Sequence, residues 1–309
     1  MTVESAAFQG LSWDPVSDLN QLFAYHFMVN ALEAGTIVAI MAGAIGWFMV
    51  IRRQTFAGHT LAVIAFPGAA GAILVGLPAL VGYYTACTVG AVALSVVSGP
   101  ENRSRASESA AIGSVQALGL ALGFLFVNLY SGVLSGLDSL LFGTFLGITD
   151  QQVGVLLAVG VAAVLVLALA GRPLYFASVD AAVARANGVP VGALSVGFLV
   201  LLGLAVAATS QITGALLVFA LLVAPAAAAQ QLTTRPAASL ALTLVISLAV
   251  TWLGLGIAYF SVYPVGFFVT TLAFAVYVLT RIVRVIADRD TPPVSRQRVP
   301  APDHAVVSG

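Results

Sequence analysis

The chain has 309 residues, of which 60% are hydrophobic and only 8% are charged, and its formal net charge is zero. Because an average soluble domain is about 25% charged, this composition excludes an ordinary soluble protein and predicts a chain that spans a lipid bilayer several times. One membrane domain would use nearly all of the chain. No room is left for a soluble catalytic domain, and no GxxxxGK(S/T) loop for nucleotide phosphates is present.

Nine apolar runs follow one another along the chain, and each is long enough, or nearly so, to cross a bilayer core of about 30 Å at about 1.5 Å per residue. They cover residues 27–51, 57–78, 81–98, 109–130, 150–171, 191–209, 211–230, 237–258 and 264–286. Because some of the turns between these runs are short, eight crossings are the alternative. The predicted fold class is all-α, a polytopic bundle of transmembrane helices over residues 27–287.

The basic residues indicate how these helices are oriented. All twelve are arginines, and an N-terminal segment 1–26 outside the cell puts every one of them on the opposite side of the membrane. Since cytoplasmic loops carry an excess of Arg and Lys, we expect the N-terminus outside and the C-terminus in the cytoplasm. The segment 288–309 is polar and rich in proline, which predicts a disordered cytoplasmic tail.

A polar stretch on the predicted cytoplasmic side has the signals of a complete short helix at 178–187. Ser178 is a candidate N-cap, Asp180 places negative charge in the first turn, and Arg185 places positive charge near the end. Gly188 favours the left-handed conformation that ends a helix. One face carries small apolar side chains at helical spacing: Val179, Ala182, Val183 and Ala186. Such a face suits docking into a groove, and the alternative is an ordinary helix of an interfacial loop.

Two ionisable side chains stand out inside the predicted spans, where each costs on the order of 2.5–3.5 kcal/mol. Glu33 lies about two turns into the first span, and His59 lies at the start of the second. A neutral imidazole is a common ligand of transition metals, and a carboxylate can join it. The structural alternatives are a hydrogen-bonded packing role for His59 and a helix–helix contact for Glu33. Pro67 and Pro225 should bend their helices, either beside a transport pathway or only for packing.

The sequence has none of the enzyme signatures that a membrane protein of this size could carry. There is no HExxH, no GxSxG, no Cys/His cluster and no pair of membrane aspartates of the kind an intramembrane protease needs. We therefore predict a transport protein with no catalytic residue, no stably bound cofactor and no nucleic-acid partner. Composition leaves open whether it is a pump subunit or an ion-driven carrier.

Four motifs, in this order, resemble the membrane subunits of bacterial ABC transporters that import zinc, manganese or iron(II). FMVNAL followed by GWFMVIRRQTFAGHTLA is similar to the family's first helix and its G-D-x-L-x-H-A segment. FGTFLGIT at 142–149 resembles an external motif, and ITGALLVFALLVAPAAAAQQL at 212–232 resembles a long glycine- and proline-containing stretch. SVDAAVARANGVP at 178–190 resembles the D-P-x-x-A-x-x-x-G-x-P helix. The resemblance covers residues 27 to 284.

This resemblance implies a type II ABC importer permease fold in the bacterial inner membrane, built from two copies of the permease. A cytoplasmic ABC ATPase would dock on the helix at 178–187 through Asp180, Ala184, Arg185 and Gly188, and would hydrolyse ATP in its own chain. An external metal-binding protein would deliver the ion. ATP binding would then pull on the docked helices and switch the side to which the pathway opens.

The chain departs from the family pattern at the positions expected to line the ion path. The family has Asp followed four residues later by His, whereas this chain has His59 and Val63, and Gln230 stands where the family usually has Arg. Loss of the carboxylate argues against manganese, a hard ion that favours oxygen ligands, and favours zinc, with manganese or iron next. The candidate metal ligands are therefore His59 and, contributing from the first span, Glu33.

Two other functions remain open on the residues alone. An ion-coupled secondary transporter could use Glu33 as its proton- or cation-coupling group. The permease of a siderophore or vitamin ABC importer would share the architecture but would need a larger, less polar channel.

Overall fold

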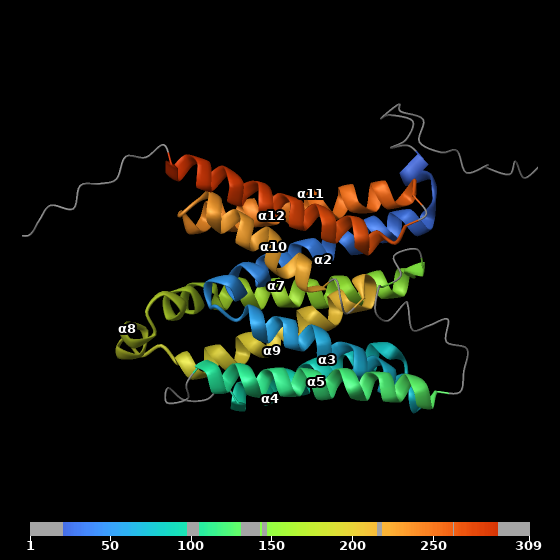
Figure 1. The fold of residues 1–309 in the computed structure, drawn as a ribbon, viewed down its shortest axis with the longest axis horizontal. Helices are drawn as coiled ribbons and strands as arrows, with labels where there is room; N and C mark the ends of the chain where they lie inside the picture. The colour runs from blue at the N-terminus through green and yellow to red at the C-terminus, as the bar shows by residue number, and fades with distance from the viewer. Residues whose placement is uncertain are drawn as a thin grey trace, which may run out of the picture.

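A computed structural model describes residues 21–97, 105–130, 143, 147–214, 218–261 and 263–289. Throughout these residues the chain is helical and contains no strand, as predicted (Figure 1). The helices are α2 (His26–Ile51), α3 (Thr55–Leu74), α4 (Ala79–Val97), α5 (Arg105–Leu129), α7 (Asp150–Val179), α8 (Ala181–Ala186), α9 (Val191–Thr213), α10 (Val218–Leu232), α11 (Pro236–Tyr259) and α12 (Val265–Arg289). The predicted external segment and cytoplasmic tail lie almost entirely outside the described residues.

Each of the nine predicted apolar runs corresponds to one helix of the described chain. Eight of these helices have the length and hydropathy of a membrane span. The ninth, α10, has 15 residues and is therefore about 22 Å long, which is shorter than the bilayer core. The alternative of eight spans therefore matches the eight long helices. The ninth predicted run is α10, which is shorter.

Helix α2 lies at the centre of the bundle and packs against α7, α10 and α11. Beyond its first turns, which carry His26, Asn30 and Glu33, it is apolar on nearly all sides, which is typical of a helix that is surrounded by others. Small residues let its neighbours approach closely. A Cβ atom added to Gly46 would lie 2.0 Å from the backbone oxygen of Leu222 in α10, so the two backbones are in direct contact there. Helices α2 and α10 therefore pack backbone to backbone at this point.

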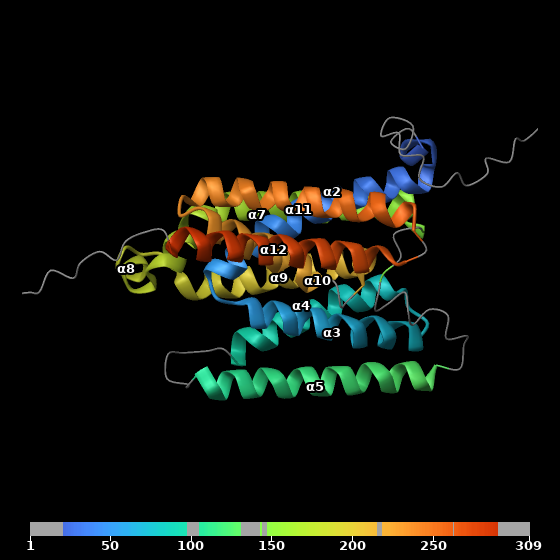
Figure 2. The same cartoon turned by 45° about the horizontal axis from the view of Figure 1, so that its top comes forward.

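Helices α3, α4 and α5 form one side of the molecule, and α5 lies at its margin (Figure 2). The Gln116 side chain of α5 donates a hydrogen bond of 2.8 Å to the Thr60 hydroxyl of α3. The rings of Phe66 and Phe124 meet edge to face 5.6 Å apart. Gln116 therefore acts between helices, as expected for a polar side chain in a span.

The two ends of the bundle differ in charge. Helix α8 marks one end, and the ends of α2, α7 and α12 and the starts of α3, α5, α9 and α11 lie toward it (Figure 1). These helix ends and the connections between them carry the arginines of the described residues. The helices thus alternate in direction as the arginine pattern requires, and the side of the membrane that this end faces stays a prediction.

Candidate functional site

His59 lies about one turn into α3, on a face that is half-buried. Its ring meets the ring of Phe219 in α10 edge to face, with 4.9 Å between the centroids. The Nδ1 atom is buried and has no hydrogen-bond partner in the protein. Because buried polar atoms normally have a partner, this nitrogen is suited to bind something other than the protein. Val63, one turn further on, is half-buried and offers only methyl groups.

Glu33 does not join His59. The carboxylate is exposed on a helix that is otherwise mostly buried, and 18 residues separate it from the end of α2 at Ile51. Since α3 runs in the direction opposite to α2 (Figure 1), the two side chains lie about 20 Å apart along the bundle axis. They therefore do not share one ion in this structure. Across the described residues, His, Cys, Asp and Glu side chains form no group of three or more that could hold a metal.

Pro67 and Pro225 lie inside α3 and α10, as predicted, and both are buried. A Cβ atom on Gly119 of α5 would lie 3.9 Å from the Pro67 ring, so this proline faces α5. Gln230, in the last turns of α10, donates a hydrogen bond of 3.1 Å to the backbone oxygen of Trp47. Where the family usually has an arginine, this chain therefore has an uncharged contact between α10 and α2.

The cytoplasmic helix predicted at 178–187 is shorter, because α8 covers only Ala181–Ala186. The prediction of Ser178 as its N-cap is wrong: α7 continues to Val179, and the Ser178 hydroxyl donates a hydrogen bond to the backbone oxygen of Leu174. Asp180 caps α8 instead. One carboxylate oxygen accepts the backbone N–H groups of Ala182 and Val183 at 3.0 and 2.9 Å.

The other end of α8 closes as predicted, because Gly188 has a φ of +80° in the left-handed region. Its N–H donates to the backbone oxygen of Arg185 at 3.0 Å, and Val189 donates to that of Ala184 at 3.0 Å. Ala184 is completely buried against Ala177 of α7 and Val191 of α9. Three of the four predicted coupling residues, Asp180, Ala184 and Gly188, thus shape or anchor α8.

The opposite face of α8 is uncovered. Val179 is 66% exposed and Val183 is 46% exposed. The exposed residues on and beside this helix are Val179, Asp180, Ala182, Val183, Arg185, Ala186, Asn187 and Gly188. They include all four members of the predicted small apolar face, so that face points away from the rest of the chain.

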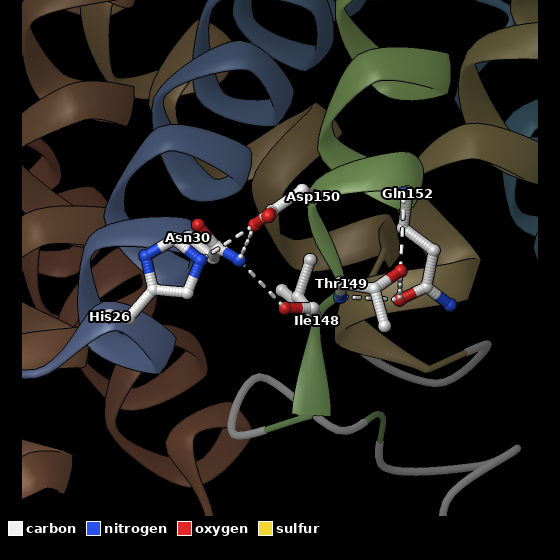
Figure 3. Close-up of polar contacts among 6 residues, drawn as sticks. All are labelled: His26, Asn30, Ile148, Thr149, Asp150 and Gln152. Carbon is white, nitrogen blue, oxygen red and sulfur yellow. Dashed lines mark hydrogen bonds and ion pairs between the residues drawn. The ribbon is translucent and has the colours of Figure 1, made fainter.

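A polar cluster at the other end of the bundle joins the start of α2 to the start of α7 (Figure 3). One carboxylate oxygen of Asp150 accepts hydrogen bonds from His26 Nε2 at 2.8 Å and from Asn30 Nδ2 at 2.6 Å. Asn30 also donates to the backbone oxygen of Ile148 at 3.1 Å. The side chains of His26 and Asp150 are 76% and 75% exposed, so the pair faces the surroundings.

Sequence reasoning missed this cluster because its members are far apart in the chain and each is ordinary by itself. One local signal was present, since Thr149 and Gln152 have the spacing of a capping box and form one in the structure. The external motif at 142–149 lies mostly outside the described residues. Gly143 is described, has a φ of +76°, and lies against the end of α9, where an added Cβ would be 2.0 Å from the Ile212 oxygen.

Comparison with known proteins identifies the family of this chain. The profile of the ABC 3 transport family matches residues 24–284. The chain belongs to this family. It is 32% identical over 216 residues to the manganese transport system membrane protein MntC of Halalkalibacterium halodurans, covering 70% of this chain and 73% of MntC. It is 30% identical over 217 residues to the chelated iron transport system membrane protein YfeC of Yersinia pestis, covering 70% of this chain and 72% of YfeC.

Solved structures have the same fold. PsaBC from Streptococcus pneumoniae in complex with Fab matches with a TM-score of 0.77 and 27% identity, over 86% of this chain and 94% of that chain. A putative metal-chelate type ABC transporter in an inward-facing conformation matches with a TM-score of 0.65 and 18% identity, over 87% and 90%. The family predicted from the four motifs is thus confirmed. The chain is a multi-pass membrane component of an ABC transporter and not an enzyme.

Proposed function

We propose that this chain is the membrane-spanning permease subunit of an ATP-driven importer of divalent transition metal ions, with ATP hydrolysed in a separate cytoplasmic chain. The observation that carries the proposal is α8, a capped helix whose small apolar face is uncovered at the arginine-bearing end of an ABC 3 family member. Relatives that are named for manganese and for chelated iron support a metal as the cargo.

The partners follow from the two ends of the bundle. A cytoplasmic ABC ATPase would dock on the exposed face of α8. An external metal-binding protein would deliver the ion at the other end, where His26 and Asp150 are exposed. A second copy of the permease would cover the exposed Glu33, because a carboxylate that faces lipid is costly. This arrangement puts the N-terminus outside a bacterial inner membrane and the C-terminus in the cytoplasm.

His59 is the residue that we propose as a transient ligand on the path, since its Nδ1 is buried without a partner. Manganese is the leading cargo because several relatives are named for it. Zinc is the second candidate, and one observation favours it: the chain offers an imidazole at position 59 and a valine at 63, with no carboxylate beside them. Nitrogen ligands favour zinc over manganese in the usual order of affinities.

The test is uptake of radioactive manganese and zinc into vesicles that contain this chain with its ATPase and metal-binding protein. We expect uptake that requires ATP, and each unlabelled metal competes in proportion to its affinity. Uptake that persists without the ATPase and collapses with the ion gradient would show a secondary transporter that uses Glu33. Transport of siderophores or vitamins, with no uptake of free metal ions, would show the other type of ABC importer.

The role of α8 is tested in the same vesicles. Val183→Glu places a charge on the exposed face of α8, whereas Val183→Thr keeps the size and shape of the side chain. We expect ATP-driven uptake to fall at least about tenfold with Val183→Glu and to stay near the level of the unaltered protein with Val183→Thr. Equal uptake in both variants, at equal amounts of membrane protein, would remove α8 from the ATPase contact.

A further inference from the structure

Arg52 lies in the tight turn between α2 and α3, and this turn is tied to the two helices that flank α8. The next residue, Arg53, has a φ of +58°, in the left-handed region that a residue with a side chain rarely adopts. The backbone closes the turn by hydrogen bonds from Arg53 to Val50 and from Gln54 to Met49. The chain therefore reverses direction within a few residues and aims the Arg52 side chain back at the bundle.

The Arg52 guanidinium bonds to both flanks of α8. Its Nη1 donates to the hydroxyl of Ser178, in the last turn of α7, at 3.1 Å. Its Nη2 donates to the hydroxyl of Ser195, near the start of α9, at 2.8 Å. Its Nε donates to Gln54 at 3.2 Å, and its carbon atom CZ lies 5.3 Å from the centre of the Phe198 ring. The planar fork of arginine allows these bonds in fixed directions, which a lysine ammonium cannot reproduce.

These bonds join a charged donor to its acceptors in a half-buried site, where water replaces a lost hydrogen bond only in part. Burial lowers the pKa of Arg52, yet an arginine in a protein keeps its proton. A buried charge that loses its hydrogen bonds is costly. When the segment between Ser178 and Ser195 moves, the turn that holds Arg52 is therefore expected to move with it rather than to separate from it.

The turn leads directly into the helix that carries His59. Helix α3 begins at Thr55, three residues after Arg52, and His59 lies about one turn into it. A displacement of the turn is transmitted along α3 because a helix moves as a rigid element. We propose that Arg52 is the positioning residue that passes movement of α8 to α3 and His59. This inference rests on the proposed function, in which an ATPase acts on α8.

The test compares Arg52→Lys with Arg53→Lys in vesicles containing the complete transporter. Both variants keep the charge, but Arg53 is exposed, so its variant is the matched control. A double variant, Ser178→Ala with Ser195→Ala, removes the two acceptors and keeps the arginine. We expect Arg52→Lys and the double variant to hydrolyse ATP at nearly the unaltered rate while metal uptake per ATP falls about tenfold, and Arg53→Lys to change neither.

A spectroscopic signature separates this role from a loss of structure. Spin labels at Asn187→Cys, directly after α8 and outside its apolar face, and at Phe56→Cys on α3 report the distance between the end of α8 and α3 with and without ATP, since the native Cys87 is buried. We expect that distance to stay constant through the cycle when Arg52 is present and to change with ATP in Arg52→Lys. Parallel loss of uptake and ATP hydrolysis, or an unchanged uptake per ATP, would overturn the inference. Absence of ATP-driven uptake in the unaltered transporter would instead overturn the proposed function.

Discussion

Gly46 shows how a single atom determines the packing of the central helix. Because an added Cβ would lie 2.0 Å from the Leu222 oxygen, no side chain fits between α2 and α10 without separating their backbones. Overpacking of this kind usually costs about 1–3 kcal/mol. Gly154, in α7, has nothing within 4 Å of the same hypothetical atom. Close packing therefore requires a glycine at position 46 but not at position 154, although both residues lie in apolar helices.

We expect Gly46→Ala to lower the thermal stability of the purified protein, by roughly 1–3 kcal/mol in free energy of unfolding. Gly154→Ala should leave stability unchanged or raise it slightly, because alanine is the better helix former. Thermal unfolding in one detergent measures both. A Gly46→Ala protein as stable as the Gly154→Ala protein would show that α2 and α10 are not in close contact.

His59 and Val63 give a prediction about ion choice. They are one helical turn apart, so Val63→His would place two imidazoles side by side. Two nitrogen ligands should raise the affinity for zinc relative to manganese by about tenfold, the scale on which neighbouring groups change metal affinity. His59→Ala should lower uptake of both ions. Competition between the two radioactive ions measures the ratio in Val63→His, and unchanged uptake of both ions in His59→Ala would remove position 59 from the path.

At the scale of elements, α8 shows what local sequence signals can and cannot predict. The terminating Gly188 is adjacent to the helix it ends and is predicted correctly, whereas Asp180 is predicted as a charge in the first turn and is in fact the cap. The start was placed too early because Ser178 is used by α7, whose length depends on packing rather than on any cap. The partners of Arg52, more than 100 residues away, have no signal in the sequence at all.

The cap at Asp180 makes a prediction of its own. Asp180→Ala removes the acceptor for two backbone N–H groups and should cost about 0.5–2 kcal/mol in helix stability. Asp180→Asn keeps an acceptor at the same place and should behave like the unaltered protein. Hydrogen exchange of the backbone in α8 measures the loss of structure. Faster exchange in Asp180→Asn than in Asp180→Ala would contradict the cap as the reason for the aspartate.

Comparing the predicted apolar runs with the observed helices explains the number of spans. Nine apolar runs were predicted from length and hydropathy, and those properties identify all nine helices. They could not predict that the helix over Val218–Leu232 would have only 15 residues, because a helix boundary inside a continuous apolar segment leaves no signal in the hydropathy. Nor could they predict that His26, Asn30 and Asp150 meet, since a hydrogen bond across 124 residues depends on the packing of whole helices.

For the molecule as a whole, the arginines at one end and the pair of His26 and Asp150 at the other suggest opposite sides of the membrane. We expect Val183→Cys in intact cells to react with membrane-impermeant thiol reagents only after the membrane is opened, and His26→Cys to react without opening. The rule that places positive charge inside is the physical reason. The reverse pattern of labelling would invert the topology and, with it, the proposed place of the ATPase.

Gly143 and the end of α9 have one further consequence for this outer side. With no room for even a methyl group between Gly143 and the Ile212 oxygen, any side chain at position 143 would push the two backbones apart. A bulkier residue at this single position would therefore disturb the end of α9 without touching the helix itself.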